Sequence, residues 1–105
     1  PDGRRVGAVT KSGKNWGLVI DGSPWKNTFD MAWQPVISPD NRYVAAKVEK
    51  NGAYTVAVND NLWPHSCEAV WDPVFSPDNS KILIKSLEEG TFFRRVVPLT
   101  DLAKR

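Results

Sequence analysis

Short apolar runs, each bounded by turn-forming residues, follow one another along most of the chain. Residues 33–38 form such a run before a Pro-Asp turn, and residues 42–48 are rich in β-forming side chains. Residues 54–58 alternate with period two after a turn at residues 50–52, where asparagine and glycine can adopt positive φ. Helix signals are weak throughout. We therefore predict an all-β chain in which residues 60–69 add a short, irregular fourth strand to these three.

The whole pattern repeats every 38 residues without a gap, with Pro-Asp pairs at positions 1, 39 and 77. The equivalent pairs that best define the repeat are Trp33 and Trp71, Pro35 and Pro73, and Asp40 and Asp78. A four-stranded unit of about 40 residues is the period of a β-propeller blade. We predict that residues 1–105 form one partial β-propeller, with repeats 1–38, 39–76 and 77–105 as just under three blades of about four antiparallel strands.

Several aromatic residues recur at this spacing. Trp16, Tyr54 and Phe92 begin equivalent strands, and we expect them to form a layer of packing residues in preference to a ligand cage. Trp33 and Trp71 each precede a Pro-Val strand, and we expect both to be buried where neighbouring units meet.

Trp25 and Trp63 are the candidate partner-binding residues. They flank proline in the loop-like part of the repeat, as Pro24-Trp25 and Trp63-Pro64. An exposed pair would suit protein binding, because tryptophan is enriched in interface hot spots. Packing between units is an equally good interpretation, and the sequence leaves both open.

Residues 65–67, His-Ser-Cys, are the one place where a base and a nucleophile stand together. No third orienting group is apparent, and a zinc site needs three or four ligands. Cys67 aligns with Phe29, so we expect its side chain to fill an apolar slot. His65 aligns with Asn27, so we expect it to lie in a loop. We predict no catalytic residue, no metal site and no cofactor.

Aspartates recur in the Ser-Pro-Asp turns as Asp2, Asp40 and Asp78. Aspartate in such a turn accepts hydrogen bonds from nearby backbone amides, and equivalent sites in different units lie too far apart to share a proton. We therefore expect structural turn residues.

Composition excludes several classes of protein. The chain has 105 residues, 41% hydrophobic and 25% charged, with a net charge of +2, which is ordinary for a globular domain. The basic residues are scattered, so we expect no nucleic-acid partner. No apolar run reaches the length of a membrane span, so we expect no direct membrane insertion. The single cysteine favours a reducing compartment, so we expect a cytoplasmic protein, with the periplasm as the alternative.

The segments 33–41 and 71–79 resemble the TolB-type, WD40-like β-propeller repeat, in which a tryptophan leads into Ser-Pro-Asp-Gly. Asn41 and Asn79 replace the usual glycine, which is tolerable because asparagine also visits the left-handed region. Residues 22–25, 29–33 and 44–52 are more narrowly similar to the tryptophan-rich D subunit of the transmembrane redox complex of sulfate-reducing bacteria. That resemblance implies a cytoplasmic accessory subunit without a redox centre, beside electron-carrying partners.

Just under three blades do not make a closed ring, which needs about four to eight. The two terminal faces would then be covered by other copies of the chain, as a ring-closing homo-oligomer, or by the remainder of a longer propeller. We favour the homo-oligomer. The sequence thus predicts a non-enzymatic scaffold for protein–protein interaction; the alternatives are a propeller that binds a small ligand or peptide, and the accessory propeller of a hydrolase.

Overall fold

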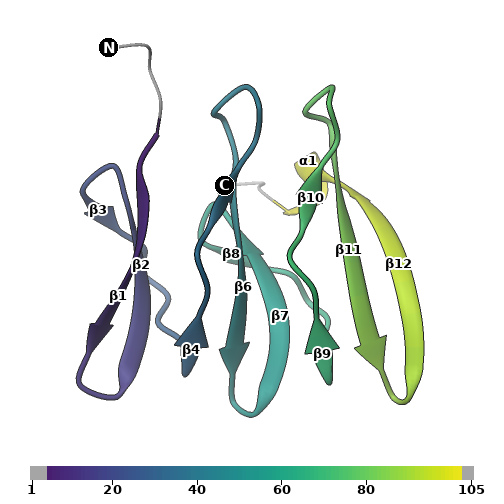
Figure 1. Ribbon diagram of the computed structural model, residues 1–105, viewed down its shortest axis with the longest axis horizontal. Helices are drawn as coiled ribbons and strands as arrows, with labels where there is room; N and C mark the ends of the chain where they lie inside the picture. Colours follow the sequence, from purple (N-terminus) through teal and green to yellow (C-terminus); the bar gives the residue numbers. More distant parts are fainter. Residues whose placement is uncertain (1–4, 103–105) are drawn as a thin grey trace.

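The computed structural model describes residues 5–102, which form three antiparallel β-sheets and one short helix. The first sheet contains β1 (Gly7–Ser12), β2 (Asn15–Ile20) and β3 (Ser23–Pro24). The second sheet contains β4 (Met31–Ala32), β5 (Val36–Ile37), β6 (Val44–Lys50), β7 (Ala53–Val58) and β8 (Asn61–Leu62). The third sheet contains β9 (Ala69–Val70), β10 (Val74–Phe75), β11 (Lys81–Glu88) and β12 (Thr91–Pro98), and α1 (Leu99–Leu102) follows it. The three sheets stand side by side in chain order (Figure 1), so the predicted all-β class is confirmed.

The central hairpin of the second sheet follows from its turn chemistry. Asn51 and Gly52 both have positive φ, 55° and 81°, as a tight two-residue turn between twisted strands requires. Lys50 is therefore paired with Ala53, and the register continues to Ala45 and Val58. The predicted turn at residues 50–52 is confirmed.

The same backbone bonds recur 38 residues apart. The N–H groups of Trp25 and Trp63 donate to the carbonyls of Leu18 and Val56, each at 2.8 Å. Further bonds recur in the same way, from Trp33 to Lys47 and Trp71 to Lys85, from Ser38 to Tyr43 and Ser76 to Lys81, and from Asp30 to Glu49 and Glu68 to Leu87. The sequence repeat is thus a repeat of local structure.

The run at residues 33–38, which we predicted as one strand, contains only the short strand β5, and β4 lies just before it. β4 and β5 both pair with β6, and the residues between them, which include Pro35, are outside any strand. β9 and β10 flank Pro73 in the same way. Proline has no N–H to donate to a β-ladder, so the long strand is paired by two short strands, one on each side of the proline, in place of one continuous strand.

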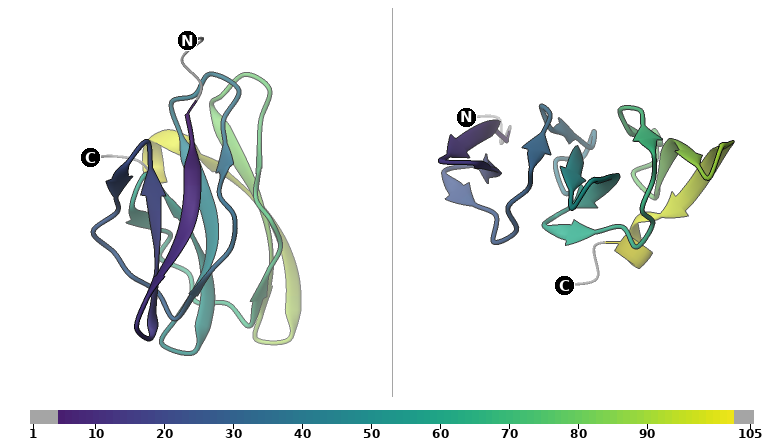
Figure 2. Two further views of the ribbon diagram at one scale, coloured as in Figure 1. Left: turned by 60° about the vertical axis from the view of Figure 1, so that its left-hand side comes forward. Right: turned by 90° about the horizontal axis from the view of Figure 1, so that it is seen from below.

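Two apolar clusters join the sheets face to face. The first joins Leu18 and Phe29 to Ala46, Val48 and Ala57, across the junction of the first and second sheets. The second cluster lies across the junction of the second and third sheets and includes Val56, Val58, Trp63, Cys67, Ile82, Ile84, Leu99 and Leu102. The views in Figure 2 place the sheets in one row, with the central sheet covered on both sides.

Close approach at the first junction depends on a glycine. A Cβ atom on Gly7 would lie 2.7 Å from Cγ of Pro35, which is inside van der Waals contact. The missing side chain at Gly7 therefore allows the first two sheets to pack closely.

The third sheet departs from the pattern at its outer edge. In the first two sheets the second long strand, β2 or β7, is followed by a two-residue strand, β3 or β8, that pairs with it. Residues 99–100 are the equivalents of β8, but they belong to α1, whose Leu99 and Leu102 are buried in the second junction. The described part of the chain therefore gives β12 no partner on its outer edge, and Figure 1 draws no strand beyond it.

Candidate functional site

Trp63 lies in the core and not on the surface. Its side chain is 5% exposed and packs in the second junction, with the His65 ring 4.3 Å from its own ring. Trp25 is half-buried against the first junction. Of the two candidate partner-binding residues, the structure therefore assigns Trp63 to packing and leaves part of Trp25 accessible.

The side chain of Trp71 is more exposed than we predicted. Trp33 is half-buried between Tyr54, at 6.0 Å between ring centroids, and the ammonium group of Lys47 at 4.7 Å. Trp71 is 44% exposed, and its ring lies 5.7 Å from the ring of Phe92. The expectation that Trp71 is buried between units is wrong for the described residues, because no sheet covers the face on which it lies.

The predicted aromatic layer is incomplete for the same reason. Trp16 packs on the first junction and Tyr54 on the second. Phe92 is 71% exposed. The expectation is thus met at two of the three equivalent positions.

The turn aspartates accept hydrogen bonds within their own turns. Asp40 accepts from the Ser38 hydroxyl at 2.7 Å and from the Arg42 N–H at 3.1 Å, and Asp78 accepts from Ser76 and Ser80 in the same way. The hydroxyls of Ser80 and Ser76 lower the pKa of Asp78 to about 2. These carboxylates are structural, as predicted; Asp2 lies outside the described residues.

Residues 65–67 do not form an activated thiol. Cys67 is buried, and burial together with the nearby Glu88 carboxylate raises the pKa of its thiol. A reactive cysteine needs a lowered pKa. Cys67 pairs with Tyr54 as Phe29 pairs with Trp16, so the predicted apolar slot is confirmed. No group of three or more potential metal-ligating residues occurs in the described part of the chain.

A charged cluster lies beside this cysteine. Glu88 accepts two hydrogen bonds from the Arg95 guanidinium, both at 3.0 Å, and one from the Ser86 hydroxyl at 2.5 Å. His65 Nδ1 lies 3.7 Å from Glu88, and the Arg95 guanidinium also stacks on Phe93 at 4.4 Å. The Arg95 side chain, principally, holds the pKa of Glu88 below its ordinary value. The bonds among Ser86, Glu88 and Arg95 join β11 to β12 within the third sheet, and His65 contacts them from the loop after β8.

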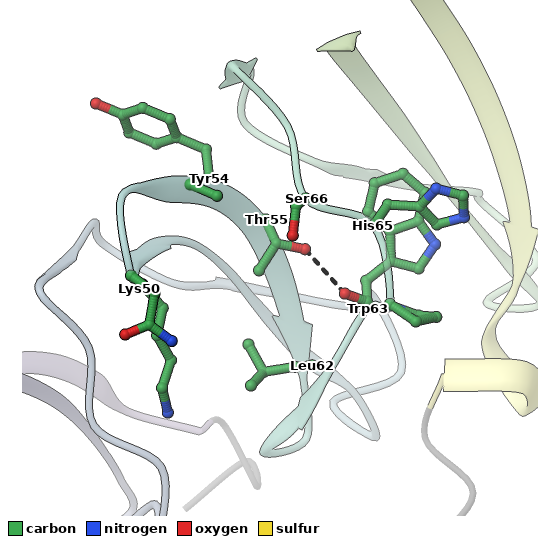
Figure 3. A pocket seen from close by; sticks show the side chains of 10 residues that line it. Lys50, Tyr54, Thr55, Leu62, Trp63, His65 and Ser66 are labelled. Carbon is green, nitrogen blue, oxygen red and sulfur yellow. Dashed lines mark hydrogen bonds between the residues drawn. The ribbon is translucent and has the colours of Figure 1, made fainter. Parts of the chain in front are cut away.

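A pocket of about 340 Å³ lies between the β6–β7 turn and the loop after β8 (Figure 3). Its polar lining includes Lys50, Tyr54, Thr55, His65 and Ser66. The Thr55 hydroxyl is engaged with the carbonyl of Trp63 at 3.0 Å. The pocket offers a small molecule aromatic and polar contacts.

The open face is the side of the third sheet away from the second sheet, and it is one of the two terminal faces that the sequence predicts to need a cover. It carries Trp71, Val74, Phe92 and Val96, which are four of the exposed large apolar residues, together with the cations Lys85 and Arg94. Val97 on the opposite face of β12 packs against the second junction. Because strand residues alternate between faces, Phe92, Arg94 and Val96 point away from that junction. The sequence signal for the open face is the segment at residues 92–95, Phe-Phe-Arg-Arg. It lacks the period-two alternation of its equivalent at residues 54–57.

Comparisons with protein-family models, with curated proteins and with solved structures found no match to this chain. In residues 5–102 there is no helix with the length and apolarity needed to cross a membrane.

Proposed function

We propose that the chain is a non-enzymatic scaffold for protein–protein interaction whose 38-residue units are blades of a β-propeller. The observation that carries this proposal is the recurrence of the same backbone bonds in sheets that stand side by side, including those of Trp25 and Trp63. Each unit buries its apolar face only against a neighbour, as blades do. The buried thiol of Cys67 and the engaged carboxylates of the turns favour a structural role over a catalytic one.

Further units of the same kind would complete the assembly. We propose that other copies of the chain supply them, in a ring-closing homo-oligomer; the remainder of a longer propeller is the alternative source. The open face supports this proposal, because large exposed apolar patches are typical of interaction surfaces. The resemblance to the D subunit of the transmembrane redox complex would place the scaffold beside electron-carrying proteins.

Native mass spectrometry and electron microscopy of the purified chain test the assembly. We expect discrete complexes of two or three copies, seen as rings, over a micromolar range of concentration. A well-folded monomer at every concentration would contradict the homo-oligomer. The test variant is Phe92→Glu, which places a charge on the open face and should reduce assembly. Its matched control is Thr28→Glu on an exposed loop, which should not.

A second candidate function is the binding of a small ligand or peptide, which the pocket beside Trp63 favours. A thermal-stability screen tests it. A ligand of this pocket should raise the melting temperature of the wild-type chain and lose that effect with Ser66→Trp, which would fill the opening.

A further inference from the structure

β1 has a free edge at the place where the equivalent strands β6 and β11 are paired. On that edge β6 pairs with β4 and β5, and β11 pairs with β9 and β10. Among residues 5–102, β1 pairs only with β2. The described part of the first sheet therefore has no counterpart of the strands that begin the other two sheets. An unpaired strand edge of this kind can accept another strand.

The backbone groups of Val9 and Lys11 point to this edge. The Val6 carbonyl accepts a hydrogen bond from the Asp21 N–H at 2.8 Å, on the side of β2. Successive residues of an antiparallel strand bond to opposite sides, so the residues at odd positions of β1 face away from β2. No other segment of residues 5–102 bonds to the backbone of Val9 or Lys11. Their N–H and C=O groups are therefore available to a further strand.

The equivalent carbonyls in the other sheets show which donor fits this edge. Lys47 and Lys85 are the equivalents of Val9 in the repeat. Their carbonyls accept hydrogen bonds from the N–H groups of Trp33, at 3.1 Å, and Trp71, at 3.0 Å. A tryptophan N–H is thus the partner of this carbonyl in both sheets where the edge is filled.

The two segments that fill these edges share one sequence pattern. Residues 31–38 read Met-Ala-Trp-Gln-Pro-Val-Ile-Ser, and residues 69–76 read Ala-Val-Trp-Asp-Pro-Val-Phe-Ser. The valine of each segment is paired with Ala45 or Leu83, and Gly7 is the equivalent of both in β1. Because the two occupants have the same pattern and the same register, they specify an occupant of the β1 edge residue by residue.

The aromatic rings point to the same occupant. The ring of Trp33 lies 6.0 Å from the ring of Tyr54, and the ring of Trp71 lies 5.7 Å from that of Phe92. Trp16 is the equivalent of Tyr54 and Phe92, and it forms no such ring pair among the described residues. The tryptophan of an added segment would supply the ring that pairs with Trp16.

The side chain of Gln34 also distinguishes the open edge from the filled one. Its Nε2 donates to the Gly7 carbonyl at 3.0 Å. In the second sheet Ala45, the equivalent of Gly7, is paired with β5, and Asp72, the equivalent of Gln34, lies 3.8 Å from the Lys47 ammonium group instead. A side-chain amide thus bonds to the open edge of β1 where a strand lies in the second sheet.

We propose that the free edge of β1 binds, as an added strand, a segment of another protein with the pattern apolar-apolar-Trp-polar-Pro-Val-apolar-Ser. Its tryptophan N–H bonds to the Val9 carbonyl, its tryptophan ring lies beside Trp16, and its valine pairs with Gly7 and displaces the Gln34 amide. Strand addition draws affinity from main-chain hydrogen bonds and specificity from side chains. This inference goes beyond the proposed function, because it depends on the repeat of local structure and on neither a closed ring nor a homo-oligomer.

The probe is the peptide of residues 31–38, labelled with fluorescein and blocked at both ends, and the measurement is fluorescence anisotropy. We expect saturable binding that depends little on salt, because the peptide segment carries no charge. A peptide with alanine in place of tryptophan should bind about tenfold more weakly, since it lacks the ring that pairs with Trp16. A peptide N-methylated at the tryptophan should bind about fivefold more weakly, since it lacks the donor to Val9. A scrambled peptide of the same composition should not bind.

Lys11→Pro tests the edge from the side of the protein. It removes an N–H that points away from β2, and proline is tolerated where the N–H of an edge strand faces solvent. We expect about fivefold weaker binding of the probe, as the loss of one backbone hydrogen bond implies. The matched control is Lys11→Gln, which keeps the N–H and should leave the affinity unchanged. Circular dichroism shows whether both variants fold, and the peptide series decides the matter if Lys11→Pro does not.

Hydrogen exchange followed by NMR locates the bound peptide. The probe should protect the amides of Val9 and Lys11, and it should leave those of Phe92 and Arg94, on the outer edge of β12, unchanged. Protection of the β12 amides instead overturns the proposal. Equal binding of the scrambled peptide, or no binding of the probe to the folded chain, overturns it as well.

Self-association is read in the same experiments. A dimer in which the amides of Val9 and Lys11 are already protected without peptide would make a second copy the occupant and overturn the separate partner. Rings that form while the probe fails to bind would overturn the edge site alone. Probe binding by a chain that remains monomeric would retain the edge site and contradict the proposed homo-oligomer.

Discussion

Phe29 and Cys67 hold equivalent places at the two sheet junctions. Phe29 exchanges two backbone hydrogen bonds with Trp16, at 2.7 and 2.8 Å, and Cys67 exchanges two with Tyr54, both at 2.9 Å. Both side chains are buried. A benzyl group at the first junction and a thiol at the second therefore occupy the same slot, and the first junction gains more apolar contact from it.

Phe29→Ala should lower the free energy of unfolding by about 3–5 kcal/mol, because it removes a fully buried aromatic ring. Urea denaturation followed by circular dichroism measures the change. Phe92→Ala is the matched control at concentrations too low for the chains to associate: that ring is 71% exposed in the single chain, and its loss should cost less than about 0.5 kcal/mol. Equal costs at the two positions under this condition would mean that the single chain itself covers Phe92.

Gly7→Ala should destabilise the chain by about 1–3 kcal/mol, the usual cost of overpacking a tight contact. The added methyl group would lie 2.7 Å from Pro35, and β1 cannot move away from that proline without loosening the first junction. Gly17→Ala is the control, since its nearest atom would be Oγ1 of Thr10 at 3.4 Å. That change should be neutral or stabilise by about 0.5 kcal/mol, because alanine restricts the unfolded chain. A neutral Gly7→Ala would show that the two sheets do not approach this closely.

The local structure of the chain was largely predictable from its sequence. The Ser-Pro-Asp-Asn turns supplied aspartates that accept hydrogen bonds within the turn, and Asn41 and Asn79 have positive φ, 65° and 64°, as expected. The alignment of Cys67 with Phe29 also placed a buried slot correctly. These features depend on contacts within a unit or between successive units, which a repeat in the sequence records directly.

The environment of the last unit was not predictable in the same way. Alignment placed Trp71 and Phe92 in packing positions because Trp33 and Tyr54 occupy such positions, but a repeat does not specify what covers its final face. The change of residues 99–100 from strand to helix depends on the burial of Leu99 and Leu102, which is a tertiary effect. The count of just under three repeats predicted an uncovered terminal face, but it did not predict that Trp71 and Phe92 lie on that face.

Trp63→Ala should cost about 3–5 kcal/mol of folding free energy, as expected for a buried aromatic side chain. Trp25→Ala should cost less, because Trp25 is only half-buried. Thermal unfolding of the two variants measures the difference. A Trp63→Ala variant that unfolds at the wild-type temperature would contradict the packing role and return Trp63 to the candidate partner-binding surface.

Acid should weaken the turn that contains Asp78. The pKa of Asp78 is lowered to about 2, from an ordinary value of 3.8, chiefly by the Ser80 and Ser76 hydroxyls, and the pKa of Asp40 is lowered in the same direction. Because the folded pKa lies below the unfolded pKa, the ionised carboxylate stabilises the fold fully above about pH 4 to 5. This contribution is lost as the pH falls towards 2. The melting temperature of the wild-type chain should therefore fall through this window.

Asp78→Asn tests the assignment, because the amide oxygen can still accept hydrogen bonds but does not titrate. Its melting temperature should depend less steeply on pH between about 4.5 and 2 than that of the wild type, with Asp40 supplying the remaining dependence. Ser80→Ala removes a donor that holds the Asp78 carboxylate at 2.7 Å and should give an intermediate slope. Identical slopes in all three proteins would show that Asp78 ionisation is not linked to folding, and carboxyl titration by NMR would then place its pKa near the ordinary value.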